Sequence, residues 1–199
     1  MNSTNHNPNL KFQEYKIDHQ AWPQFQTDIE AVAKIAYHDN HLLIEFVVKE
    51  PFIQSEFRNP NGPVHKDSCV EFFVRFDDDE NYYNLELNAL GNTKLAYGPG
   101  RNNRTRVPEE LINQIERKVY IKPINKAENL LIEWSIFVAI PLQAFGFHQL
   151  ENLNEHQMFG NFYKCADDYD APHYLSWSAI KSEHPDFHRP EYFRPLSFL

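Results

Sequence analysis

The stretch DSCVEFFVRFDDDENYYNLELNALG, residues 67–91, contains two runs of alternating polarity on either side of the acidic break DDDEN. Apolar side chains occupy every second position of both runs: Val70, Phe72, Val74 and Phe76 in the first, and Tyr83, Leu85 and Leu87 in the second. A period of two is typical of half-buried β-strands, so the stretch predicts an antiparallel hairpin.

The register of this hairpin follows from its apolar rows, because a slip of one residue would put a polar row into the core. Apolar side chains face each other if Phe76 pairs with Tyr83, Val74 with Leu85 and Phe72 with Leu87. The same register pairs, on the other face, Arg75 with Asn84, Phe73 with Glu86 and Glu71 with Asn88.

That other face has two interpretations. An ordinary solvated sheet face would carry such cross-strand polar pairs without any ligand. A ligand platform would use the same groups, because a sugar offers hydroxyls at its rim and C–H bonds on its faces to carboxylates, amides and an aromatic ring.

The composition limits the class of protein. The 199 residues suit one domain with a sizeable core, and 13 Pro with only 6 Gly favour short strands with rigid connections. The formal net charge of −9 excludes nucleic acid and an anionic membrane surface as expected partners, because both are bound mainly through basic residues. The start MNSTNHNPNL lacks the features of a signal peptide, which predicts a cytoplasmic location, or an extracytoplasmic one if a leader has been removed.

The two cysteines, Cys69 and Cys165, do not form a disulfide framework, and each lies in a strand-like run. We expect small buried hydrophobic side chains there, with a bridge between them as the less favoured alternative.

About ten short strand-like runs follow one another along the chain, which is typical of an antiparallel β-sandwich. Residues 1–9 are polar and predict a disordered tail, and residues 10–199 predict the sandwich domain. Residues 31–37 and 41–48 form a second predicted hairpin, with Leu42, Ile44, Phe46 and Val48 facing inward. Residues 51–66 predict a long loop, residues 98–106 an irregular loop with three arginines, and residues 108–117 the one short helix.

Four segments resemble carbohydrate-binding module family 9 and its wider DOMON-like group of β-sandwiches (jelly-roll or immunoglobulin-like). They are KIAYHDNHLLIEFVVKEP, DSCVEFF, LSWSAI and FHRPEYFRPLSF, in the order that the family has them and spread over most of the chain. The resemblance implies a module that grips the end of a sugar chain between two tryptophans, above polar strand residues, and that is associated with glycoside hydrolases and carbohydrate catabolism.

The resemblance also assigns residues. Glu71 corresponds to a glutamate below the sugar, and Phe187 to one of the stacking tryptophans. The polar row of the next strand corresponds to Asn84, Glu86 and Asn88, and a later glutamine corresponds to Lys164. His188 and Arg189 follow Phe187; they could reach the ligand, or Arg189 could pair with a carboxylate.

Two positions depart from the family. Val64 stands where the second tryptophan would lie, and Glu86 stands where the family has an arginine. The resemblance therefore implies a sugar platform without the usual cellulose- or xylan-end specificity. Tyr97, Phe57 and His65 are the candidates to replace the missing ring.

No cofactor is predicted. The acidic turn that contains Asp77 and Asp79 could hold a structural calcium ion, but it lacks the glycine and the terminal glutamate of a dedicated calcium loop, so a solvated turn is the expectation.

We therefore predict a non-catalytic module whose partner is a carbohydrate, bound by the 68–88 hairpin face with its Arg75 and closed by the 184–190 arm. Two alternatives remain open. One is a glycan-active hydrolase or lyase that uses Glu71 and Glu86, since glycosidases need two carboxyl groups about 5–10 Å apart. The other is a protein-interaction domain with a vestigial sugar face.

Overall fold

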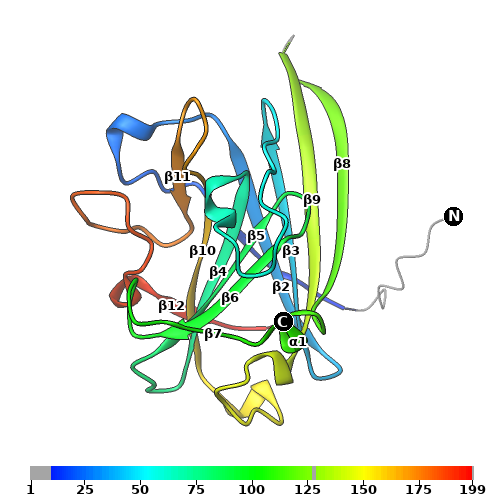
Figure 1. Ribbon diagram of the computed structural model, residues 1–199, viewed down its shortest axis with the longest axis vertical. Coiled ribbons are helices and arrows are strands. Elements are labelled where there is room, and N and C mark those ends of the chain that lie inside the picture. The colour runs from blue at the N-terminus through cyan, green and yellow to red at the C-terminus, as the bar shows by residue number, and fades with distance from the viewer. Residues whose placement is uncertain (1–9, 127–128, 199) are drawn as a thin grey trace, which may run out of the picture.

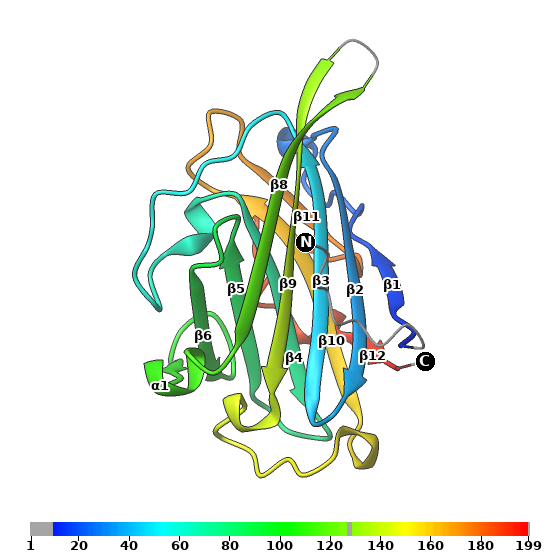
Figure 2. The same cartoon turned by 90° about the vertical axis from the view of Figure 1, so that its right-hand side faces the viewer.

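The computed structural model describes residues 10–126 and 129–198, so the predicted tail of residues 1–9 lies outside the described residues. Two antiparallel sheets pack face to face (Figure 1). The smaller sheet has the order β1 (Gln13–Lys16), β2 (Glu30–His38), β3 (His41–Glu50), β9 (Asn129–Pro141) and β8 (Glu116–Lys126). Figure 2 shows this sheet in front, with the β8–β9 hairpin extending beyond the body. The predicted all-β sandwich is confirmed.

The larger sheet carries the hairpin of residues 67–91. Its order is β11 (His173–Ser176), β10 (Met158–Ala166), β4 (Cys69–Phe76), β5 (Tyr82–Asn88), β6 (Thr93–Gly98) and β7 (Thr105–Arg106), and β12 (Arg194–Leu196) also pairs with β10. Single 3-10 turns lie at Pro23–Phe25, Val64–Lys66, Leu142–Ala144, Leu153–Glu155 and Pro190–Tyr192.

The predicted helix over residues 108–117 is only partly correct. The helix α1 spans Glu109–Ile112, and the chain enters β8 at Glu116. From Glu116 on, eleven residues pair with β9. The hydrogen bonds of this ladder stabilise the strand more than the local helix propensity would stabilise a longer helix.

Alternating side chains fill the space between the sheets, as the sequence predicts. Leu42, Ile44, Phe46 and Val48 of β3 are fully buried, and Trp134 of β9 lies beside them in the core. The β2–β3 turn has Asp39 and Asn40 in the left-handed region (φ 47° and 58°), as a two-residue hairpin turn requires.

The β4–β5 hairpin has the predicted faces but not the predicted register. Val74 pairs with Tyr83, Phe72 with Leu85 and Val70 with Leu87, a shift of two residues from the prediction. The chain reverses earlier than the middle of DDDEN: Asp77 adopts φ 49°, and the N–H of Asp79 donates to the carbonyl of Phe76 at 3.2 Å. Because the shift is two residues, each side chain keeps its face, but Glu71 now lies opposite Glu86 instead of Asn88.

The outer face of the larger sheet is not an open solvated surface. A second apolar cluster covers it, in which Phe187 and Phe193 of the C-terminal segment and Trp22 pack over Phe73 and Tyr163. Glu71 and Glu86 are therefore only 3% and 2% exposed, although they point away from the main core.

Candidate functional site

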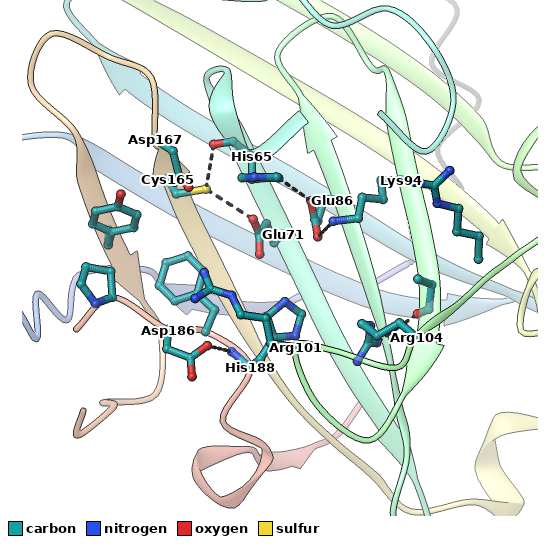
Figure 3. Close-up of a pocket in the computed structure, with 15 residues that line it drawn as sticks. His65, Glu71, Glu86, Lys94, Arg101, Arg104, Cys165, Asp167, Asp186 and His188 are labelled. Atoms are coloured by element: carbon teal, nitrogen blue, oxygen red, sulfur yellow. Dashed lines mark hydrogen bonds and ion pairs between the residues drawn. The ribbon is translucent and has the colours of Figure 1, made fainter. Parts of the chain in front are cut away.

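A pocket of about 390 Å³ lies on this outer face (Figure 3). Its floor comes from strands β4, β5, β6 and β10, and its walls come from the arginine-bearing loop after β6, from β11 and from residues 185–188 of the C-terminal arm. The lining residues are His65, Glu71, Glu86, Lys94, Ala96, Arg101, Arg104, Arg106, Cys165, Asp167, Tyr174, Pro185, Asp186, Phe187 and His188. The volume lies within the range of small-molecule sites, about 300–1,000 Å³.

Two glutamates form the floor of the pocket, side by side because the β4–β5 register places them directly opposite each other. Glu86 Oε1 accepts hydrogen bonds from Lys94 Nζ and Asn84 Nδ2, both at 2.7 Å. Glu86 Oε2 is buried at 3.5 Å from His65 Nδ1 and makes no hydrogen bond within the described residues. A buried carboxylate oxygen with no donor is uncommon, and a ligand hydroxyl could satisfy it.

The two carboxyl groups have opposite pKa shifts. Burial, followed by the negative charge of Glu86, raises the pKa of Glu71 well above its usual range. Burial also acts to raise the pKa of Glu86, but the neighbouring His65 and Lys94 outweigh it and hold this pKa below its usual value. The shifts favour the protonated form of Glu71, which can donate, and the ionised form of Glu86, which accepts.

An aromatic wall closes one side of the pocket. Phe187 stacks on Tyr163 with ring centroids 4.2 Å apart and an interplanar angle of 12°, and Tyr174 meets Phe187 edge-on at 6.1 Å. His188 comes next in the arm, where its Nδ1 lies 2.7 Å from Tyr82 Oη. Burial, reinforced by the charge of Arg104, lowers the pKa of His188 to about 3, so this imidazole is neutral.

The pocket contains four of the nine predicted ligand residues: Glu71, Glu86, Phe187 and His188. Asn84 and Asn88 lie on the predicted face, but their side chains form hydrogen bonds with other groups of the protein. Asn84 bridges Glu86 and Arg104, and Asn88 Nδ2 donates to Asp67 Oδ2 at 2.8 Å.

Three predicted ligand residues lie outside the pocket. Arg75 lies near the hairpin turn, where its guanidinium is 4.9 Å from the Phe159 ring. Arg189 pairs with Glu191 at 2.8 Å, which is the alternative that the sequence left open. Lys164 faces the opposite side of β10, and its Nζ lies 3.1 Å from Glu50 Oε2 between the two sheets. Since neighbouring residues of a strand alternate between faces, Cys165 takes the pocket position instead.

No aromatic ring occupies position 64, where the resemblance places the second stacking tryptophan. Val64 is fully buried in the second apolar cluster. Of the three candidates to replace the ring, His65 lines the pocket, whereas Tyr97 stacks on Phe147 and Phe57 packs against the second apolar cluster.

Sequence reasoning missed the residues that distant segments bring to the pocket, namely Lys94, Tyr174, Asp167, Asp186 and the arginines of the loop after β6. The arginines did carry a signal, since three in six residues stand out in an acidic chain. Nothing local indicated that this loop folds over the β4–β5 hairpin.

Cys69 and Cys165 are free and buried, directly opposite each other on β4 and β10, which confirms the predicted unbridged state. Burial raises the pKa of Cys69 to about 11. The hydrogen bond with Cys69, together with burial, raises the pKa of Cys165. Both are therefore thiols at neutral pH, and thiols react slowly because the thiolate is the nucleophile.

We expect both cysteines of the native protein to react with a chromogenic disulfide reagent at pH 8 at least about a hundredfold more slowly than in the denatured chain. The measurement is the time course of reagent release with and without guanidinium chloride. The variant Cys165→Ser, with one thiol, is the control for counting sites. Fast release of two equivalents from the native protein would contradict the buried thiol pair.

One set of residues in the described part of the chain could hold a metal ion. The candidate ligand atoms of Cys69, Glu71 and Cys165 all lie within 4.8 Å of one another, and thiolates favour soft ions such as zinc. At the acidic turn, Asp77 binds His156, and Asp79 binds Asn81 and Tyr97. The expectation of a solvated turn, with calcium as the less favoured alternative, stays a prediction.

The antiparallel sandwich and its enclosed pocket of carboxyl groups, cations and aromatic rings define a small-molecule binding module. The model for carbohydrate-binding family 9 matches residues 4–198, and the chain belongs to this family. It is a carbohydrate-binding module, as the sequence predicts. Within the described residues, no helix is long and apolar enough to cross a membrane.

One similar solved structure agrees with this assignment. A candidate carbohydrate-binding protein from Bacteroides uniformis ATCC 8492 is 31% identical with a TM-score of 0.85, over 94% of this chain and 87% of that one. Two structures of a family 9 module from Caldicellulosiruptor kristjanssonii, in complex with cellotriose and with glucose, are 14% identical. Their TM-scores are 0.47 and 0.48, over 96% of this chain and 83% and 85% of theirs. A comparison with curated proteins finds no match.

Proposed function

We propose that the pocket binds the terminal residue of an oligosaccharide or polysaccharide, without a cofactor. The observation that carries this proposal is the floor of the pocket, where the buried Glu86 Oε2 has no hydrogen-bond donor within the described residues. A sugar hydroxyl would supply that donor. Glu71 lies beside it, and its raised pKa favours the protonated form, which would donate to a second hydroxyl or to a ring oxygen.

The shape of the pocket supports recognition of a chain end. The C-terminal arm closes one side with Phe187, and the loop after β6 closes another with Arg104. A cavity of about 390 Å³ between such walls suits one or two sugar rings better than the middle of a long chain. Phe187 is held against Tyr163, so its orientation is fixed before a ligand arrives.

The test is calorimetric titration with sugars that a glycan array selects, on wild type and on Phe187→Ala and Glu71→Ala. Each variant is expected to weaken binding about 5- to 100-fold, because each removes a packed ring or a buried hydrogen-bonding group worth about 1–3 kcal/mol. Tyr120→Ala is the matched control, because Tyr120 is 57% exposed on β8 of the other sheet.

Unchanged affinity in both pocket variants would overturn the site assignment. The same samples are incubated with the selected oligosaccharides, and the products are analysed by chromatography. Turnover that Glu71→Gln abolishes would favour the enzyme alternative over the binding module.

A further inference from the structure

The cationic residues of the pocket come mainly from one short segment. Arg101 and Arg104 lie in the loop after β6, and Arg106 lies on β7; all three line the pocket. The whole chain has a formal net charge of −9, so this cluster of arginines is a local positive region in an acidic protein. A local excess of cations at a cleft attracts anionic ligands.

Arg104 is built into the wall of the pocket. Its Nε donates to Asn84 Oδ1 at 2.8 Å, its Nη2 donates to the carbonyl of Tyr82 at 2.7 Å, and its guanidinium lies 4.3 Å from the Tyr82 ring. Gly98 permits the loop to pack this closely, because a Cβ at residue 98 would lie 2.8 Å from the carbonyl oxygen of Asn103 and 3.2 Å from Arg104 Cγ.

The partners of Arg104 are all uncharged, and no carboxylate of the described residues lies within ion-pair distance of it. Its hydrogen-bonding capacity is used, but its positive charge is not neutralised by direct contact. Burial lowers the pKa of Arg104, which shows the cost of holding this charge out of water. The wall of the pocket is therefore positively charged.

Arg101 and Arg106 have the opposite character. Both are exposed, and within residues 10–126 and 129–198 neither side chain makes a hydrogen bond or an ion pair. Each guanidinium offers a planar set of donors that matches a carboxylate, a sulfate or a phosphate. Figure 3 shows Arg101 among the residues around the pocket.

Four carboxyl groups also line the pocket, and within the described residues none of them lies within ion-pair distance of the three arginines. Glu86 is paired with Lys94 at 2.7 Å, and burial raises the pKa of Glu71, which favours its uncharged form. Asp186 accepts the backbone N–H of His188 at 3.1 Å, and burial raises the pKa of Asp167 while the charge of Arg101 acts to lower it. Asp167 and Asp186 therefore offset part of the positive charge, but within the described residues neither forms an ion pair with Arg101 or Arg106, whose guanidinium donors stay available to a ligand.

We propose that the sugar bound in this pocket carries an anionic group, a carboxylate as in a uronic acid or else a sulfate or phosphate ester, which Arg101 and Arg106 bind. The proposal rests on the proposed function of the pocket and adds a ligand class to it. Glu71 and Glu86 take the hydroxyls of the same sugar, and the positive wall at Arg104 favours the anion over a neutral analogue.

The test compares sugars that differ only at the charged group. Glucose and galactose are titrated beside glucuronic and galacturonic acid, and beside their 6-sulfate and 6-phosphate esters. Wild type is expected to bind at least one anionic class at least about tenfold more tightly than its neutral parent, since a hydrogen bond to a charged group contributes about 1.5–3 kcal/mol. The preference is expected to shrink at high salt, because exposed charges are screened.

The double variant Arg101→Gln, Arg106→Gln is expected to lose most of this preference, measured as the ratio of its affinities for the anionic sugar and for the neutral parent. Lys118→Gln removes one exposed positive charge from β8 of the other sheet and serves as the control. Which of the three anionic groups binds best identifies the natural one.

A wild type that binds neutral and anionic sugars equally, or a double variant that keeps the preference, would overturn this proposal. If neutral binding persists and is lost in Phe187→Ala, the proposed function still stands. If no sugar of any class binds, both proposals fail.

Discussion

Replacing Lys164 by methionine is expected to lower the free energy of unfolding by about 3–5 kcal/mol. Lys164 and Glu50 are fully buried between the sheets, where Lys164 Nζ also lies 2.9 Å from His173 Nε2. Burial, reinforced by the charge of Lys164, lowers the pKa of His173 to about 3, so the neutral imidazole accepts this hydrogen bond. Without the ammonium, Glu50 is a buried charge with no counter-ion.

Urea unfolding followed by tryptophan fluorescence measures this loss. The double variant Lys164→Met, Glu50→Gln is expected to recover much of it, because the amide carries no charge and still accepts from Trp134 Nε1. A loss below about 1 kcal/mol in Lys164→Met, typical of an exposed pair, would contradict the buried geometry. Sugar affinity is expected to stay unchanged while the variant is folded, since Lys164 faces away from the pocket.

Replacing Glu71 by glutamine is expected to stabilise the protein at neutral pH and to change how its stability depends on pH. The folded state raises the pKa of Glu71 above the value in the unfolded chain, chiefly through burial. Between these two pKa values the folded state holds a proton that the unfolded state has released. The free energy of unfolding of wild type therefore falls as the pH rises through this window, by at most about 1.4 kcal/mol per pH unit for this group.

Glutamine cannot ionise, so the free energy of unfolding of the variant does not fall with rising pH through this group. Below the ordinary pKa of a glutamate, both proteins are expected to have similar stability, and the advantage of the variant should grow as the pH rises from there. Unfolding curves at several pH values between 4 and 8 measure the difference. Glu116→Gln, an exposed glutamate on β8, is the control. An advantage that grew toward acid pH instead would show that Glu71 is ionised in the native state.

Alternation in the sequence was sufficient to predict the sandwich and the face that carries the site. Glu71 and Glu86 could be placed on the outer face of the hairpin because side-chain direction in a strand depends only on parity. The same parity, applied to the neighbouring strand, would have put Cys165 in the pocket rather than Lys164. The family correspondence, by contrast, assigned Lys164 to the site.

Other parts of the site could not be predicted from local patterns. The loop after β6 reaches the pocket because Arg104 binds Asn84 and backbone carbonyls of distant strands. Tyr174 and Asp186 meet there only once β11 and the C-terminal arm are in place. Contacts between segments this far apart in the chain leave no periodic signal.

The sequence alone determined that residues 67–91 form a hairpin with one apolar and one polar face, because that property resides in the two-residue repeat of each strand. Only the tertiary structure decided which polar residues meet across it. The early reversal after Phe76 moved the register by two residues, which left both faces intact and set Glu71 against Glu86. The covering arm then buried this pair beside the cations of the loop. Burial by the arm and the nearby positive charges give the two neighbouring carboxyl groups opposite pKa shifts. Neither cause can be read from the sequence of a single strand.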